Sequence, residues 1–448
     1  MSWTQRSAGV LLHISSLPSR QLGADALRFM DVMAQAGLRV WQILPVGPTT
    51  KYHNPFEPAS AFAGDPTLVP LGAGDGADED SFEAFQREHA DWLPDWALFS
   101  ALEQELGDLP WWEWPPPLRE RESPALEAAR EHLATHIEHA CLAQFAFERA
   151  WSGLRAQAHA RGIRIFGDVP LFVSHNSAEV WTHRELFEVD PNGQCAAVVG
   201  VPPDAFSETG QFWGYPPYRW EVMAQTGFAW WKRHFEIQAR RFDLVRLDHF
   251  RGFAAWWRIP QGARSAAEGA WTPGPGRAAI DALAPMLGGA QLVAEDLGVI
   301  TEDVIAMRQA LGIPGMRVLQ FAFDGNPHNP HLPASHGPDT ICYTGTHDND
   351  TTLGWWRSAP AHERENVARF LGQAEPAMPH ALVDCALASS APLSIVPMQD
   401  LLELGAEARM NRPGVAEGNW RWRFDWAQLS ADFGPPLRAR LAQHGRLP

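Results

Sequence analysis

Eight short apolar runs, separated by stretches with helical patterning, constrain the fold of this chain more than any other feature. Short apolar strands that alternate with helices are typical of a parallel sheet, and eight strands are the number that closes a (β/α)8 barrel. We therefore expect an α/β fold of the (β/α)8 TIM-barrel class, with residues 1–448 forming a single barrel. The runs comprise residues 9–14, 40–46, 164–170, 244–250, 291–297, 316–321, 341–346 and 392–398.

The segments between these runs predict helices and two insertions. An apolar stripe predicts a helix over residues 24–36, and a second helix is expected over 301–311 with Thr301 as its N-cap. Two connections are too long to be plain helices, 71–160 and 185–240, and the first includes a predicted long helix over 123–159. Both follow strands, so we expect them to be inserted subdomains that rise above the functional face of the barrel.

The composition excludes several classes of protein. The formal net charge of −17, from 53 acidic against 36 basic residues, argues against nucleic acid or an anionic membrane as a partner. The four cysteines are scattered without a C-x-x-C pair, so neither a zinc knuckle nor a disulfide framework is expected. With no run of membrane-spanning length and no secretion signal, we expect a cytoplasmic protein. The oligomeric state is left open.

Tryptophan is over-represented, with 21 residues against 4 tyrosines. Flat indole rings suit the apolar faces of sugar rings, while the indole N–H still finds a polar partner. The alternative is that most of them fill the core, and we expect this for more than half. The excess of tryptophan therefore favours sugar binding without establishing it.

Three acidic residues stand just past the ends of separate apolar runs: Asp248, Glu295 and Asp348. In a barrel the carboxyl ends of the strands meet at one face, so these acids should share a cleft. Cleavage of a glycosidic bond needs two carboxyl groups, one that attacks the anomeric carbon and one that protonates the departing oxygen. The pattern thus indicates chemistry on a neutral, polyhydroxylated substrate such as a sugar chain.

Neighbouring residues support this interpretation. Arg246 lies two positions before Asp248, so both point the same way on a strand, and a guanidinium there favours the ionised form that a nucleophile requires. His347 could bond a ring hydroxyl, and Asp168 could bind hydroxyls or cap a turn. For each residue alone, a buried ion pair, a helix cap or a satisfied loop histidine is the commoner role. Three acids at separate strand ends reverse that preference.

Other kinds of site lack sequence support. The chain has no G-x-G-x-x-G or P-loop pattern, so we expect no nucleotide cofactor. It has no H-E-x-x-H motif and no G-x-S-x-G motif, so neither a catalytic metal nor a serine nucleophile is predicted. We expect no cofactor at all.

Several longer motifs resemble one family. Segments such as 41–48 (WQILPVGP), 200–211 (GVPPDAFSETGQ), 246–252 (RLDHFRG) and 345–352 (GTHDNDTT) are similar to the 4-α-glucanotransferases called amylomaltases, of glycoside hydrolase family 77. The likeness extends from residue 9 to residue 422. It implies a (β/α)8 barrel with inserted subdomains and a retaining transfer of α-1,4-glucan segments between maltooligosaccharides.

The resemblance also implies roles for individual residues. Asp248 corresponds to the nucleophile, Glu295 to the general acid/base, and Asp348 to a stabiliser of the transition state. The remaining matches are expected to bind substrate, as donor-side contacts or as residues lining the glucan cleft. They are Phe56, Asp168, Asp204, Gln211, Trp213, Arg246, Asp324, His347 and Asn411.

Two positions depart from the family pattern. Asn54-Pro-Phe56 stands where the family often has Ser-Pro-Tyr, which removes a hydroxyl, although Phe56 could still stack. Tyr215 replaces a residue that is usually smaller, so the sequence does not determine the geometry of the acceptor side. Two alternatives to a transferase remain: an α-1,4-glucan hydrolase of the α-amylase type, and an inactive glucan-binding barrel.

Overall fold

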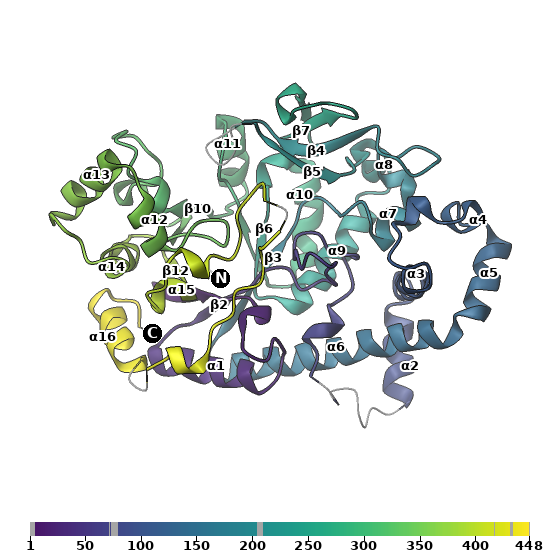
Figure 1. Cartoon of the computed structure of the whole chain (residues 1–448), viewed down its shortest axis with the longest axis horizontal. Coiled ribbons are helices and arrows are strands. Elements are labelled where there is room, and N and C mark those ends of the chain that lie inside the picture. Colours follow the sequence, from purple (N-terminus) through teal and green to yellow (C-terminus); the bar gives the residue numbers. More distant parts are fainter. Residues whose placement is uncertain are drawn as a thin grey trace.

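All eight apolar runs form strands of one parallel sheet in the computed structural model, which describes residues 5–70, 72, 79–203, 209–415, 417–430 and 433–447 (Figure 1). The strands are β1 (Ser7–Leu11), β2 (Val40–Gln42), β3 (Arg164–Val169), β6 (Leu244–Leu247), β9 (Gln291–Ala294), β10 (Gly315–Val318), β11 (Thr340–Tyr343) and β12 (Leu393–Pro397). Their order in the sheet is β10-β11-β12-β1-β2-β3-β6-β9. The (β/α)8 barrel is thus confirmed.

The barrel is nearly closed, because hydrogen bonds join β9 and β10, the strands at the two edges of the sheet. The Ala294 N–H of β9 donates to the Pro314 carbonyl at 2.9 Å, just before β10. Two residues beyond β9, the Asp296 carboxylate accepts a bond from the Met316 N–H at 2.6 Å. The Arg308 guanidinium lies 3.3 Å from the same carboxylate, which compensates its burial. Asp296 therefore has a structural role, because it joins the end of β9 to β10.

The inside of the barrel changes from apolar to charged along the strands. Alternate residues of a strand point to the same side, so Phe166 and Asp168 of β3 share a face, as do Leu244 and Arg246 of β6. Phe166 and Leu244 belong to an apolar cluster that fills the interior. Asp168 and Arg246 are also buried, one step nearer the carboxyl ends. The strands therefore carry a charged layer at the end where the acids follow.

Helices alternate with the strands around the barrel. They are α1 (Ala24–Ala36), α6 (Ala134–Ala160), α9 (Ala229–Arg241), α10 (Arg277–Leu283), α11 (Glu302–Ala310), α14 (His380–Ala388) and α16 (Gly434–Gln443). The other helices are α2 (Glu79–Glu88), α3 (Leu93–Glu105), α4 (Pro116–Arg119), α5 (Ser123–His132), α7 (Ala178–Thr182), α8 (Trp220–Gln225), α12 (Thr352–Ser358), α13 (Ala361–Leu371) and α15 (Met398–Leu401). The predicted helix over 24–36 is confirmed, and α11 begins directly after Thr301 as predicted.

The prediction of one long helix over residues 123–159 is wrong. The segment forms α5 and α6, which are separated at Leu133. Leu133 is buried with φ −101° and ψ 16°, so the chain turns where this side chain enters the core. Figure 1 shows α5 bending away from the line of α6. Neither glycine nor proline marks the break, so helical periodicity could not reveal it.

A second sheet was not predicted from the sequence. Its four antiparallel strands are ordered β5-β4-β7-β8. The strands β4 (Ala197–Val201) and β5 (Gln211–Tyr215) lie within the connection 185–240, whereas β7 (Ala255–Pro260) and β8 (Ala270–Pro273) come from the connection after β6. Figure 1 shows β4, β5 and β7 of this sheet at the top of the view, above β6. Pairing between two separate connections is a long-range property that local patterns do not specify.

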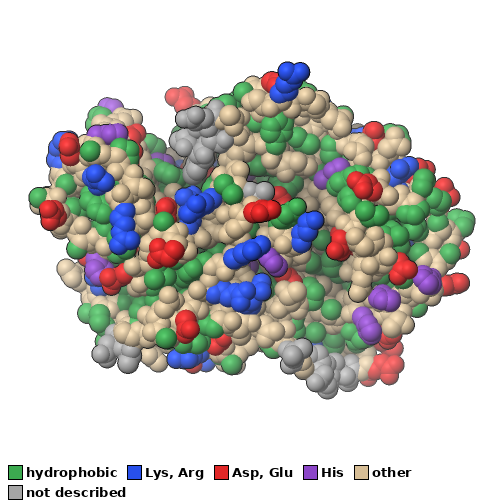
Figure 2. Space-filling view, in the orientation of Figure 1, with side chains coloured by type: hydrophobic (Ala, Val, Ile, Leu, Met, Phe, Trp, Pro, Cys, Tyr) green, Lys and Arg blue, Asp and Glu red, His purple; other side chains and the backbone are tan. Residues whose placement is uncertain are grey.

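The surface is mixed in charge. Figure 2 shows basic side chains near the middle of one face, interspersed with acidic ones, although the net charge is −17. Within the described ranges, no helix has the length and apolar character needed to cross a bilayer.

Candidate active site

Asp248 and Glu295 follow neighbouring strands at matching positions. Leu247 of β6 and Ala294 of β9 are partners in the sheet. Each is the last residue of its strand, and the acid comes directly after it. The Glu295 N–H donates to the Leu247 carbonyl at 3.0 Å, which keeps the pairing up to the acids themselves. Both side chains therefore leave the same edge of the barrel, as the sequence predicted.

Backbone amides hold the Glu295 carboxyl in place. Its Oε2 atom accepts a bond from the His249 N–H at 2.8 Å, and its Oε1 atom accepts one from the Leu297 N–H at 2.8 Å. His249 has φ 49° and ψ 46°, a left-handed conformation that is uncommon for a residue with a side chain. The turn directly after Asp248 thus directs an N–H toward the neighbouring acid.

The protonation of Glu295 is set by its surroundings. Burial raises its pKa to about 8; the Arg246 guanidinium opposes this shift, and the charge of Asp248 adds to it. A carboxyl group with this pKa holds its proton at neutral pH and can donate it. Glu295 therefore has the property of a general acid.

Arg246 bridges two carboxylates. Its Nη1 atom lies 2.8 Å from each oxygen of Asp168, in register on β3, and 2.8 Å from Oδ1 of Asp248. Burial works against the charge of Arg246, but the surrounding carboxylates raise its pKa well above the ordinary value. A guanidinium that keeps its positive charge therefore lies in contact with Asp248.

Asp348 is oriented by residues from another part of the chain. It lies in the turn after β11, and its Oδ1 atom accepts a bond from the Asn411 side-chain amide at 2.6 Å. The Arg409 guanidinium donates to the Asp348 main-chain carbonyl at 2.7 Å. The segment after β12 therefore fixes both the main chain and the side chain of Asp348, and the structure brings together two residues that were predicted separately, Asp348 and Asn411.

His347 lies between Asp348 and a small aromatic group. Its Nε2 atom is 3.4 Å from Asp348 Oδ2, and its ring stacks on Phe56 at 4.9 Å and 22°. Trp420 lies 5.9 Å from each of these two rings. Burial lowers the pKa of His347, with Asp348 acting in the opposite direction, which favours a neutral imidazole. A neutral imidazole can donate and accept hydrogen bonds to hydroxyl groups.

Gln211 and Trp213 reach the site from the second sheet. Both are on the same face of β5, where the Trp213 indole N–H donates to Gln211 Oε1 at 3.3 Å. The Trp213 ring meets the His249 ring edge to face at 4.8 Å. Since the His249 amide holds Glu295, these two residues lie at the side of the site formed by β6 and β9.

Two predicted residues are not joined to this group. Asp324, in the loop after β10, is exposed, and its Oδ1 atom accepts a local bond from the Asn326 N–H at 2.9 Å. Asp204 lies outside the residues that the structure describes.

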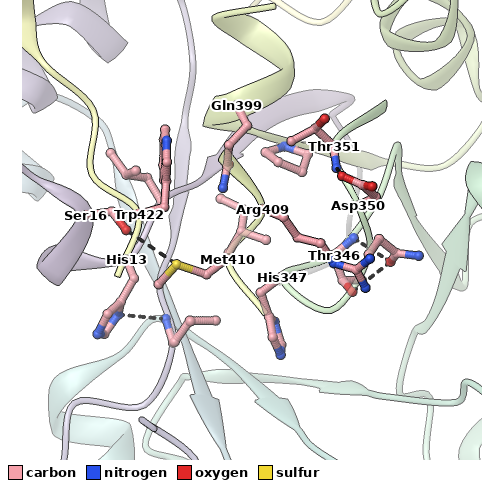
Figure 3. Close-up of a pocket in the computed structure, with 15 residues that line it drawn as sticks. His13, Ser16, Thr346, His347, Asp350, Thr351, Gln399, Arg409, Met410 and Trp422 are labelled. Atoms are coloured by element: carbon pink, nitrogen blue, oxygen red, sulfur yellow. Dashed lines mark hydrogen bonds between the residues drawn. The ribbon is translucent and has the colours of Figure 1, made fainter. Parts of the chain in front are cut away.

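His347 also lines a pocket between the segments that follow β1, β11 and β12 (Figure 3). His13 and Ser16 enter it from the segment after β1, and Arg409, Met410 and Trp422 enter it from the segment after β12. His13 accepts a bond from the Leu44 N–H at 3.2 Å through Nδ1, so its proton is on Nε2. Asp248 and Glu295 are not among the described residues that line this pocket.

Sequence reasoning missed the part that His249 plays and undervalued Tyr215. The backbone role of His249 depends on its left-handed conformation, which its residue type does not predict. Tyr215 could have been found, because it continues the alternation of Gln211 and Trp213 on one face of β5. As expected, more than half of the tryptophans are buried rather than in the site.

Most of the chain matches a known protein family. A family model described as 4-alpha-glucanotransferase, for glycoside hydrolase family 77, matches residues 12–75 and 72–429. The chain belongs to this family. It is therefore an enzyme of the 4-α-glucanotransferase class, and the resemblance seen in the sequence motifs is confirmed.

Individual relatives agree with this assignment. A 4-alpha-glucanotransferase of Thermus thermophilus is 43% identical, with 99% of each chain covered. The chloroplastic/amyloplastic 4-alpha-glucanotransferase of Solanum tuberosum is 38% identical over 99% of this chain and 87% of the relative. The solved amylomaltase of Streptococcus agalactiae, in complex with acarbose, has a TM-score of 0.94 at 30% identity and covers 99% of this chain and 100% of its own. The family's fold is thus present over nearly the whole chain.

Proposed function

We propose that this enzyme transfers α-1,4-glucan segments between maltooligosaccharides by a retaining double displacement. The observation that carries the proposal is the pairing of Asp248 and Glu295 at adjacent strand ends in opposite electrostatic settings. Asp248 lies against the Arg246 guanidinium, whereas burial and the charge of Asp248 raise the pKa of Glu295 to about 8. A nucleophile needs the first setting and a general acid the second.

The two half-reactions follow from these properties. Glu295 gives its proton to the glycosidic oxygen while Asp248 attacks the anomeric carbon, which releases the first product and leaves a glycosyl ester on Asp248. Glu295 is then a carboxylate and takes the proton of an acceptor 4-hydroxyl. That oxygen attacks the same carbon and displaces Asp248, so the configuration is retained.

The surrounding residues would bind and distort the sugar at the reacting bond. Asp348, fixed by Asn411, would stabilise the positive charge that develops on the sugar ring, and His347 would bond its hydroxyls. Phe56 would add an apolar face beside His347. Asp168 and Arg246 would contact the donor side, while Gln211, Trp213, Asp204 and Asp324 would line the rest of the cleft.

Transfer and hydrolysis differ only in what resolves the glycosyl enzyme. The aromatic side of the site formed by Trp213 should favour a stacked glucose ring over water. Incubation with maltotriose should therefore give glucose and longer maltodextrins, with little net gain in reducing ends. A ladder of products resolved by chain length, together with a reducing-end assay, checks this. One new reducing end for each bond broken would identify a hydrolase instead.

The pH dependence of transfer should have an alkaline limb set by Glu295. Because the acid must carry its proton in the first step, kcat/KM should be high below its pKa of about 8 and fall as the pH rises through that value. Initial rates with maltotriose from about pH 6 to about pH 10 would measure the limb. A profile that stays flat throughout this range would contradict the role given to Glu295.

A further inference from the structure

A hydrogen bond connects the second sheet to the loop that follows β2. The Tyr215 hydroxyl, at the end of β5, donates to the Phe56 main-chain carbonyl at 3.1 Å. These residues are 159 positions apart in the sequence. The Phe56 N–H donates locally to Asn54 Oδ1 at 3.0 Å, and four residues further on the Ser60 hydroxyl donates to Glu179 at 2.6 Å. Tyr215 thus ties this loop to a distant part of the fold.

The tied residue is the one that touches the site. The Phe56 ring stacks on His347 at 4.9 Å, and His347 Nε2 is 3.4 Å from Asp348. Tyr215 therefore fixes the backbone of the residue whose ring supports the imidazole next to a proposed transition-state stabiliser. On the other side, its ring lies 6.3 Å from Trp213, which meets His249. The hydrogen bond from the Tyr215 hydroxyl therefore joins the side of the site that carries Trp213 to the side that carries Phe56 and His347.

The protonation of Tyr215 suits a permanent donor. Burial raises its pKa well above the ordinary value, and the charges of Glu57 and Asp248 add to the shift. The hydroxyl therefore keeps its proton at every pH at which Glu295 can act as an acid.

We propose that Tyr215 is a positioning residue, whose hydroxyl holds Phe56 and, through the stacked rings, the His347 imidazole in the geometry that the sugar ring meets during transfer. The inference rests on the proposed function. Phe56 carries no hydroxyl of its own, and Tyr215 supplies one from the opposite side of the site. In this chain the loop is therefore held from the second sheet.

The test is Tyr215→Phe, which removes the hydroxyl and keeps the ring. Hydrogen exchange of the peptide covering residues 50–58 should become about fivefold faster, the effect of losing one hydrogen bond. With maltotriose, kcat should fall by about fivefold while KM changes by less than about twofold, because the lost geometry matters most in the transition state.

Tyr218→Phe is the matched control. Tyr218 is a buried tyrosine three residues away, and its hydroxyl has no hydrogen-bond partner among the described residues. This variant should leave both the exchange of residues 50–58 and kcat unchanged. The proposal is overturned if Tyr215→Phe behaves like Tyr218→Phe, or if exchange speeds up while kcat does not change. Failure of the wild type to transfer glucan would instead refute the proposed function, because the exchange measurement needs no turnover.

Discussion

Replacing Asp248 with asparagine should abolish glucan transfer while leaving the fold and the binding of maltodextrin largely intact. An amide cannot form the glycosyl ester, so the maltotriose transfer rate should fall by about 10⁴-fold or more. The side chain of Asp248 is 27% exposed, so the substitution should cost little stability. Transfer would be measured by the product ladder, and binding by calorimetry with maltoheptaose.

The matched control for this prediction is Asp281→Asn, the same chemical change on helix α10. Asp281 is 52% exposed and pairs with Arg277 on the helix surface, where ion pairs contribute little. This variant should transfer glucan at the wild-type rate. Transfer by Asp248→Asn at more than a few per cent of that rate would remove Asp248 as the nucleophile. A wild type that bound glucan without turnover would support the alternative of an inactive barrel.

Among the substitutions proposed, replacing Arg246 with methionine should lower the free energy of unfolding the most. The substitution leaves Asp168 buried without its counter-ion, and breaking a buried pair in this way costs about 3–5 kcal/mol. Burial already raises the pKa of the Asp168 carboxyl, and Arg246 is the main group that opposes the shift. The loss should therefore be small where the folded protein keeps Asp168 protonated with or without Arg246, and should grow as the pH rises through the Asp168 pKa of about 7. Urea unfolding at a series of pH values measures it.

Two further variants make this second prediction specific. Asp168→Asn combined with Arg246→Met removes the buried charge and should recover most of the lost stability. Arg258→Met breaks the ion pair with Glu188, whose side chains are 35% and 29% exposed, and should cost less than about 1 kcal/mol. A pH-independent loss in Arg246→Met would show that packing, rather than the uncompensated Asp168 charge, explains the effect.

The eight strands could be predicted because each one is a short, mostly apolar run that is largely buried. Runs such as residues 244–247 carry this signal within themselves, without any distant partner. The second sheet carried no such signal, because β4 and β5 must pair with β7 and β8 from a different connection. Likewise, the break at Leu133 depends on the core that receives this side chain.

Some residues of the candidate site could be predicted from the sequence, whereas the contacts that orient them could not. Asp248, Glu295 and Asp348 could be found because each one interrupts an apolar pattern at a strand end. The groups that tune them come from elsewhere in the chain: Asn411 orients Asp348, and the Tyr215 hydroxyl holds Phe56. No local pattern predicts these contacts, since they join residues that are 63 and 159 positions apart.

The sequence by itself determined the barrel class, the family and the residues that stand at the strand ends, because period, burial and residue type are local properties of a strand. Only the tertiary structure decided which carboxyl group holds a proton. That property depends on the register that pairs Leu247 with Ala294, on the Arg246 charge and on burial, which exist only once distant segments have packed together.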